Sequence, residues 1–264
     1  MPESPLARRD RGEPLRILVT NDDGINAPGL EVLERVAHTI SPEVWVVAPE
    51  TNQSGASHSL TLRRPLRLRR IKPRRYAIDG TPTDCVLLAI QTILKDASFD
   101  LVLSGVNQGG NLGEDVGYSG TVAAAMEATL FNVPAFALSQ EYKSGEPVSW
   151  ATAERFAPDI ISRLLTKEWA QDTFINVNFP NRPPDKVQGY RVATQGKRKL
   201  GDELFERIDP RGEPYVWIGV LREDSNAPEG TDLAAVAEGY VAITPIHMDM
   251  THRPSLAKLL EALA

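Results

Sequence analysis

Residues 15–24, LRILVTNDDG, join a strand of the buried type directly to a cluster of polar side chains. Residues 15–20 are a nearly continuous apolar run, which is typical of a strand covered on both faces. Asn21, Asp22, Asp23 and Gly24 follow at once. In an open α/β sheet, ligands bind outside the carboxyl ends of the strands. The pattern therefore places Asp22 and Asp23 where a ligand would bind.

The remainder of the first half alternates strands with helices. Apolar spacing predicts helices over residues 27–40, 82–94 and 119–131, and buried strands over 44–48, 101–104 and 134–139. Buried strands separated by helices indicate βαβ units with right-handed crossovers. The first half thus predicts an α/β fold with a parallel sheet.

The second half is mixed. Helices are expected over 150–165 and 256–263, and strands over 174–179, 190–194, 215–220 and 240–244. Residues 180–230 are rich in Pro, Gly and charged residues, which indicates hairpins that project from the core. Residues 1–14 are expected to form a disordered leader, and residues 15–264 a single domain.

Composition limits the kind of protein. The chain has 264 residues, a net charge of −6 and one cysteine, Cys85. The acidic balance argues against general nucleic-acid binding, so no duplex partner is expected. No apolar run reaches the roughly 20 residues of a membrane span, and the first residues lack a signal-peptide core. A lone cysteine requires no oxidising compartment. We therefore expect a cytoplasmic protein that acts away from membranes.

One segment departs from the acidic balance. Residues 63–75, RRPLRLRRIKPRR, hold eight basic residues, and Leu66 and Leu68 alternate with arginines as in a strand with one wet face. The pattern favours an edge strand whose arginines face water and discourage edge-to-edge pairing. The alternative is a patch that steers anionic substrates.

Three polar loops follow predicted strands and should meet at one edge of the sheet. They contain Asp22 and Asp23, then residues 49–55 with Ser54, then residues 105–111 with Asn107. Oxygen ligands without histidine or thiolate suit Mg²⁺, Mn²⁺ or Ca²⁺ better than zinc. Two adjacent carboxylates repel unless a cation lies between them. Together the loops predict a divalent-metal site.

Each of these residues also has an ordinary structural interpretation. One aspartate could cap the helix that begins near residue 27 while the other is solvated. Ser54 and Asn107 could be turn residues. Residues 119–121, Ser-Gly-Thr, open a helix, and could either bind an anion such as phosphate or cap the helix.

At the level of whole motifs, the chain resembles the SurE (survival protein E) nucleotidase family. The resemblance is carried by ILVTNDDGINAPGL (17–30), VVAPETNQSGASHSLTL (46–62), GTPTDCV (80–86) and LVLSGVNQGGNLGEDVGYSGTVAAAMEAT (101–129). Later pieces such as INVNFP (175–180) extend it to about residue 255. Residues 193–196 match the family's late basic motif only loosely.

The resemblance implies a three-layer, Rossmann-like, mostly parallel sheet with helices on both faces and a protruding C-terminal β-hairpin that assists dimer or tetramer formation. It also implies hydrolysis of nucleoside 5′- and 3′-monophosphates with one divalent cation, Mg²⁺ or Mn²⁺. Carried over residue by residue, the metal ligands would be Asp22, Asp23, Ser54 and Asn107. The substrate phosphate would lie among Asn52, Ser119, Gly120 and Thr121.

The hypothesis for the reaction is attack by a metal-activated water, with Asp22 and Asp23 as the catalytic pair. Either aspartate could take the proton of the water. A second hypothesis makes one aspartate a nucleophile that forms an aspartyl-phosphate, although aspartates in haloacid-dehalogenase-type sites stand two apart rather than adjacent. A rival from another class is a non-catalytic protein that senses a nucleotide or a metal.

Overall fold

The computed structural model describes residue 8 and residues 11–143, 145–167, 170–198, 204–218 and 227–264. Within them the central element is a nine-stranded sheet in the order β3-β4-β2-β1-β5-β6-β7-β11-β8. Its strands are β1 (Arg16–Thr20), β2 (Glu43–Pro49), β3 (Leu68–Lys72), β4 (Arg75–Ile78), β5 (Leu101–Gln108), β6 (Ala135–Gln140), β7 (Thr173–Phe179), β8 (Tyr190–Val192) and β11 (Val241–His247). Neighbouring strands run parallel from β4 to β7, whereas β3 and β11 run antiparallel to β4 and β7.

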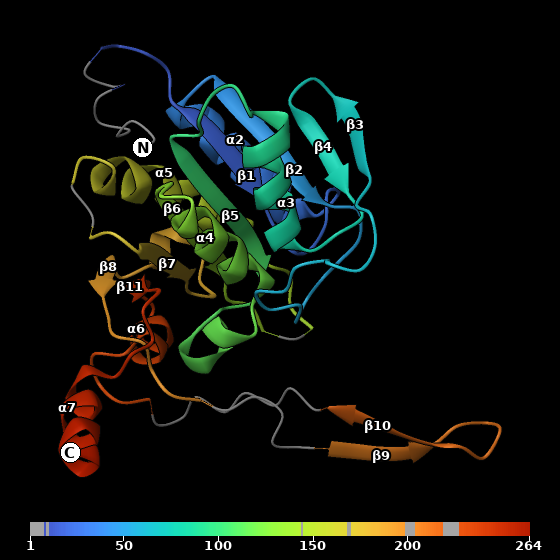
Figure 1. Cartoon of the computed structure of the whole chain (residues 1–264), viewed down its shortest axis with the longest axis vertical. Helices are drawn as coiled ribbons and strands as arrows, with labels where there is room; N and C mark the ends of the chain where they lie inside the picture. The colour runs from blue at the N-terminus through green and yellow to red at the C-terminus, as the bar shows by residue number, and fades with distance from the viewer. Residues whose placement is uncertain (1–7, 9–10, 144, 168–169, 199–203, 219–226) are drawn as a thin grey trace.

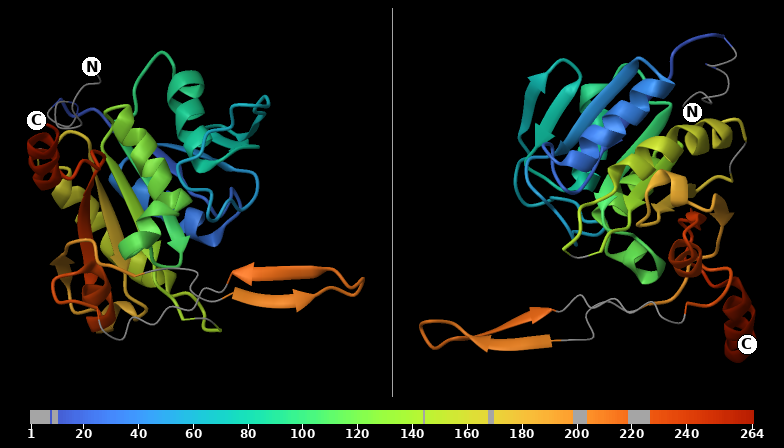
Figure 2. Two further views of the ribbon diagram at one scale, coloured as in Figure 1. Left: turned by 60° about the horizontal axis from the view of Figure 1, so that its bottom comes forward. Right: turned by 180° about the vertical axis from the view of Figure 1, so that it is seen from behind.

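Helices cover both faces of this sheet, as the views from opposite sides show (Figures 1 and 2). The helices are α2 (Pro28–Ile40), α3 (Pro82–Leu88), α4 (Gly120–Leu130), α5 (Trp150–Leu164), α6 (Asp232–Glu238) and α7 (Arg253–Leu263). Side chains of β1 alternate between the two layers: Val19 packs with α2 and α5, and Leu18 packs with α3 and α4. The predicted mostly parallel α/β fold is therefore confirmed.

A two-stranded antiparallel hairpin, β9 (Leu204–Ile208) and β10 (Pro214–Ile218), stands away from the sheet (Figure 2). Every residue of both strands is exposed. It corresponds to the protruding hairpin that the sequence predicts between residues 180 and 230. No helix among the described residues is both long enough and apolar enough to cross a membrane.

Helix α4 lies very close to the sheet because its side chains are small. Ala123, Ala124, Ala125 and Ala128 are each at most 1% exposed, and the helix packs on β5, β6 and β7. Small side chains let a helix axis approach a sheet, and dense packing then fixes its position. The N-terminal end of α4 is thereby held beside the end of β1.

Several expected elements have different bounds. Strand β5 continues through Gln108, with a register irregularity between Ser104 and Asn107, so the glycine-rich run is part strand rather than all loop. The helix expected over 82–94 ends as α3 at Leu88 and continues as a π-turn, Ala89–Ile93. The short helix α6 and strands β4 and β9 were not predicted.

The basic segment behaves as two different structures. Strand β3 is an edge strand, as predicted, but both of its faces are exposed, whereas the sequence predicts only one wet face. Arg75, which begins β4, is only 9% exposed, so the expectation that the arginines face water is wrong for this residue. Arg64, Arg69 and Lys72 form ion pairs with nearby carboxylates, which favours the edge-strand interpretation over a steering patch.

Most of the expected leader lies outside the described residues. Of its described part, Arg8 is buried and forms an ion pair with Asp100 at 3.4 Å, whereas residues 11–14 are exposed. The leader and the single-domain division remain predictions. Cys85 is buried, and burial raises the pKa of its thiol, as expected of a small core residue.

The GTPTDCV motif joins α3 to the loop that follows β2. Thr81 and Asp84 form a capping box at the start of α3. The same Asp84 carboxylate accepts hydrogen bonds from the backbone N–H of Thr61 at 3.0 Å and from its hydroxyl at 2.6 Å. One buried carboxylate therefore joins the helix start to Thr61, in the segment that follows β2.

Replacing Asp84 with alanine should lower the free energy of unfolding by about 2–4 kcal/mol, since it removes a helix cap and leaves buried donors unpaired. Urea unfolding measures this change. The matched control is Asp96→Ala at an exposed position, expected to stay within about 0.5 kcal/mol of wild type. Equal stability of the two variants would contradict the joining role of Asp84.

Candidate active site

The candidate site is centred on Asp22 and Asp23, immediately beyond β1. Asp22 is 3% exposed, whereas Asp23 is partly exposed. The turn after them requires Gly24, whose φ is +103° and whose missing Cβ would lie 3.2 Å from the carbonyl carbon of Thr51. The Asn21 side chain closes the turn by donating to the Gly24 carbonyl at 3.0 Å. Neither aspartate caps α2, because the N-cap is Ala27 without a side-chain hydrogen bond, so the capping interpretation is excluded.

Asp22 faces the N-terminal end of α4. Its Oδ1 accepts a hydrogen bond from the Thr121 hydroxyl, and the backbone N–H groups of Thr121 and Gly120 also stabilise its charge. Burial nevertheless dominates and raises the pKa of Asp22. The helix start that the sequence identifies as a possible anion site thus already holds one anion, the Asp22 carboxylate.

Asp23 lies between the other two loops. Its Oδ1 accepts from the Asn52 side chain at 3.4 Å, and its Oδ2 from the backbone N–H of Gln108 at 3.2 Å. Burial and the neighbouring Asp22 charge raise the pKa of Asp23 to about 6. Within the described residues, neither carboxylate has an ion pair with a Lys, Arg or His side chain.

The loop after β2 is fastened against this pair. The backbone N–H of Gln53 donates to the Asp22 carbonyl at 2.7 Å. Ser54 lies in an exposed turn, and its N–H donates to Asn52 Oδ1 at 2.8 Å. Farther along, the His58 imidazole is 2.9 Å from the Glu127 carboxylate of α4. Ser54 is thus held near Asp23 through Asn52, although no direct contact joins Ser54 to either aspartate.

The third loop contributes through strand β5. Asn107 donates from its side-chain nitrogen to the Gly109 carbonyl at 2.8 Å, which fixes the orientation of its amide. Gln108, its neighbour, makes the contact to Asp23. The three predicted loops therefore converge on the aspartate pair. Gln108 is a contact that the sequence did not indicate, because it acts through its backbone.

Ser119 serves as the N-cap of α4. Its hydroxyl accepts from the backbone N–H of Val122 at 3.1 Å, and its carbonyl accepts from Ala123 at 3.0 Å. The capping interpretation is therefore confirmed for Ser119. Since Gly120 and Thr121 direct their N–H groups to Asp22, the first turn of α4 already has partners within the protein.

The donor set fits a hard divalent cation. No group of three or more His, Cys, Asp and Glu side chains suited to a metal occurs in the described part of the chain. Two adjacent carboxylates, both disfavoured by burial, gain from a cation, and the nearby amide and hydroxyl groups offer neutral oxygens. Gly120 leaves room, since a Cβ there would fill the space beside Asp22.

Comparisons with known proteins show the family of the chain. Residues 17–202 match the family model described as "Survival protein SurE". The chain is 58% identical over 245 residues to "5'-nucleotidase SurE" of Paramagnetospirillum magneticum, covering 93% of this chain and 94% of the relative. It is 53% identical to the protein of the same name from Parvibaculum lavamentivorans, covering 94% of this chain and 91% of the relative.

A solved structure shows the same likeness in three dimensions. The chain superimposes on the crystal structure of a SurE protein from Aquifex aeolicus with a TM-score of 0.83 and 39% sequence identity. The match covers 94% of this chain and all of the other. The similarity therefore includes both the sheet and the loops that carry the candidate site.

Replacing Gly120 with alanine should displace Asp22, since the added Cβ would lie 2.7 Å from Asp22 Cβ and 3.0 Å from Oδ2. We expect the free energy of unfolding to fall by about 1–3 kcal/mol, as in overpacked cores. The matched control is Gly117→Ala, which adds the same methyl group where nothing lies within 4 Å. If both variants unfold at the same denaturant concentration, Asp22 does not pack against α4 as described.

Proposed function

The chain belongs to the SurE survival-protein family, and we propose that it is a 5′-nucleotidase, which hydrolyses nucleoside monophosphates to nucleoside and phosphate. The observation that carries the proposal is the convergence of three polar loops on Asp22 and Asp23. Relatives that share more than half of its residues over nine-tenths of the chain are named as such enzymes. An enzyme is therefore the better account than a non-catalytic sensor.

We further propose that Asp22, Asp23, Ser54 and Asn107 hold one divalent cation, Mg²⁺ or Mn²⁺. Support comes from the two carboxylates, whose charges burial disfavours and which no cationic side chain of the described part offsets. When bound, such a cation supplies Lewis-acid polarisation of the phosphate and lowers the pKa of a water enough to make it a nucleophile.

The two carboxylates would then have different tasks. Asp22 is directed toward α4 and accepts a hydrogen bond from the Thr121 hydroxyl, so its proposed task is to hold the cation in place. Asp23 is the more open of the two and is held from both sides by Asn52 and Gln108. We therefore assign to an Asp23 oxygen the proton that leaves the attacking water, which is general base catalysis. An aspartyl-phosphate remains the alternative.

The substrate phosphate would lie beside Asn52 and the residues Ser119, Gly120 and Thr121. The backbone donors of Ser119, Gly120 and Thr121 have partners within the protein, so these three residues would contribute the partial positive charge of the helix N-terminus. Positive potential at this point favours the charge carried by the equatorial phosphoryl oxygens in the transition state.

Three further proposals concern the substrates, the cellular location and the oligomeric state of the protein. We propose activity on 3′- as well as 5′-monophosphates, and work in the cytoplasm, where a lone buried cysteine is at no disadvantage. We also propose a homodimer or homotetramer. Support for association comes from the hairpin β9–β10, which exposes apolar side chains on both of its faces. Its register places Leu204, Ile208, Val216 and Ile218 on one face, and Phe205 and Trp217 on the other.

Asp22→Asn and Asp23→Asn should each lower kcat for AMP on the order of a hundredfold or more, because each removes a charge that the transition state uses. The melting temperature should stay the same or rise, since burial raises both carboxylate pKa values and the ionised pair therefore opposes folding near pH 7. Phosphate release and calorimetry measure the two effects.

The control for these variants is Asp96→Asn, which changes the same group at an exposed position. Wild-type turnover in both Asp22→Asn and Asp23→Asn would exclude the pair as catalytic residues. A large fall in melting temperature would instead assign them a structural role.

Removal of divalent metal with EDTA should abolish phosphate release from 5′-AMP and 3′-AMP, and Mn²⁺ or Mg²⁺ should restore it. Because a ligand that binds only the folded state stabilises it by mass action, the added metal should also raise the melting temperature. That rise should disappear in Asp22→Asn and Asp23→Asn. Full activity of the EDTA-treated protein with no thermal shift would refute the metal site and leave the nucleotidase assignment intact.

A further inference from the structure

Arg75 contacts the loop of the aspartate pair from outside the candidate site. One guanidinium nitrogen, Nη2, donates to the carbonyl of Ile25 at 2.7 Å, and another, Nη1, donates to the Glu34 carboxylate. Ile25 follows Asp23 by two residues. Arg75 is only 9% exposed and lies at the start of β4, fifty residues away in the chain.

The Ile25 carbonyl is buried and therefore requires a hydrogen-bond donor. The Ile25 side chain is 1% exposed, and its N–H donates to the Pro49 carbonyl of β2 at 2.8 Å. A buried carbonyl without a partner is costly, and a hydrogen bond from a charged donor is about twice as strong as a neutral one. The contact from Arg75 therefore gives the loop a second anchor at Ile25, in addition to the hydrogen bond to Pro49 of β2.

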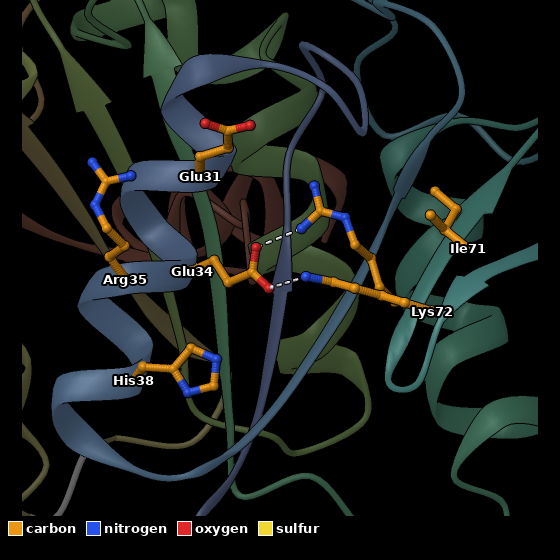
Figure 3. Close-up of a pocket in the computed structure, with 7 residues that line it drawn as sticks. Glu31, Glu34, Arg35, His38, Ile71 and Lys72 are labelled. Atoms are coloured by element: carbon orange, nitrogen blue, oxygen red, sulfur yellow. Dashed lines mark hydrogen bonds and ion pairs between the residues drawn. The ribbon is translucent and has the colours of Figure 1, made fainter.

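Glu34 holds Arg75 in turn. Glu34 belongs to α2, and its carboxylate also pairs with Lys72 of β3 at 3.6 Å. Figure 3 shows Glu34 and Lys72 directed toward each other. Both line a surface cavity of about 490 Å³, together with Arg35 and His38. Helix α2, the sheet edge and the aspartate loop thus meet through one guanidinium.

We propose that Arg75 is a positioning residue for the reaction: it fixes the backbone that follows Asp22 and Asp23 and so keeps both carboxylates in reactive geometry. The proposal rests on the proposed nucleotidase function only in that these carboxylates do the chemistry. Reaction rates are sensitive to displacements of about 1 Å in groups that orient the reactants. Without the hydrogen bond from Arg75 to Ile25, the loop would sample displacements of this size.

An arginine is required because the two acceptors lie on different elements. The planar guanidinium carries donors in a fixed fork, so it can reach the Ile25 carbonyl and the Glu34 carboxylate together. The lysine ammonium is a point charge on a flexible stem. Arg75→Lys therefore keeps the positive charge, but its ammonium can form a good hydrogen bond with only one of the two acceptors, Ile25 or Glu34.

The test compares Arg75→Met and Arg75→Lys with the control Arg35→Met. Arg35 lines the same cavity and pairs with Glu154 at 2.7 Å, but it is exposed and does not reach the loop. Two readouts are taken: amide hydrogen exchange of a peptide that covers residues 21–30, and kcat and KM for AMP with Mn²⁺ present. A peptide over β6 reports global opening.

For Arg75→Met we expect exchange in residues 21–30 to accelerate by about tenfold or more while the β6 peptide is unchanged. We expect kcat to fall by about tenfold or more, and KM to change by less than about threefold, since the phosphate is held mainly by other residues. Arg75→Lys should give intermediate values, and Arg35→Met should match wild type.

Unchanged exchange in residues 21–30 of Arg75→Met would overturn the proposal, as would an equal effect from Arg35→Met. Exchange that rises equally in the β6 peptide would also overturn it, because the residue would then act only on global stability. If Arg75→Met does not fold, Arg75→Lys provides the same readouts. A wild-type protein that releases no phosphate would refute the nucleotidase function, and the exchange experiment would still decide whether Arg75 holds the loop.

Discussion

The burial of the Asp22 carboxylate beside Asp23 is the constraint on which the rest of the site depends. Two like charges at adjacent positions repel, and burial makes each one less favourable still. The protein offsets part of this penalty with the Thr121 hydroxyl, the first N–H groups of α4 and the backbone of Gln108. The remaining penalty is what the proposed cation would relieve, so the repulsion between the two carboxylates is the physical basis of the proposed metal site.

The parallel sheet makes this arrangement possible. Strands β1, β2 and β5 are neighbours and run in the same direction, so the loops that follow them open at one edge. Each loop has its own local hydrogen bonds. Asp84 holds Thr61 in the segment after β2, Asn21 closes the turn at Gly24 after β1, and Asn107 donates to the Gly109 carbonyl in the β5 segment. The positions of the site residues are well defined because strands and helices hold the loop backbone at several points.

Sequence alone predicted the parallel sheet, the convergence of the loops and the aspartate pair at their centre. These follow from local patterns, namely apolar runs and the polar residues that end them. Contacts between distant residues did not follow. Arg75 sits in a basic run that resembles a surface strand, and its burial depends on Ile25 and Glu34, which are 50 and 41 residues away. The contact from Gln108 was missed because any residue type can supply a backbone N–H. Helix α6 was missed because seven residues are about two turns, too few for a helical repeat of apolar residues to be recognised.

The alanine-rich surface of α4 has a consequence for how this enzyme can vary. Ala123, Ala124, Ala125 and Ala128 set the distance between the helix and the sheet, and that distance places the helix end against Asp22. Buried side chains in the interior of α4 therefore help to place a carboxylate of the proposed active site. A larger side chain at any of these positions would push the helix away from the sheet and move Thr121, the partner of Asp22, with it. The residues that determine the geometry of the proposed active site therefore include the buried interior of α4 as well as the loops.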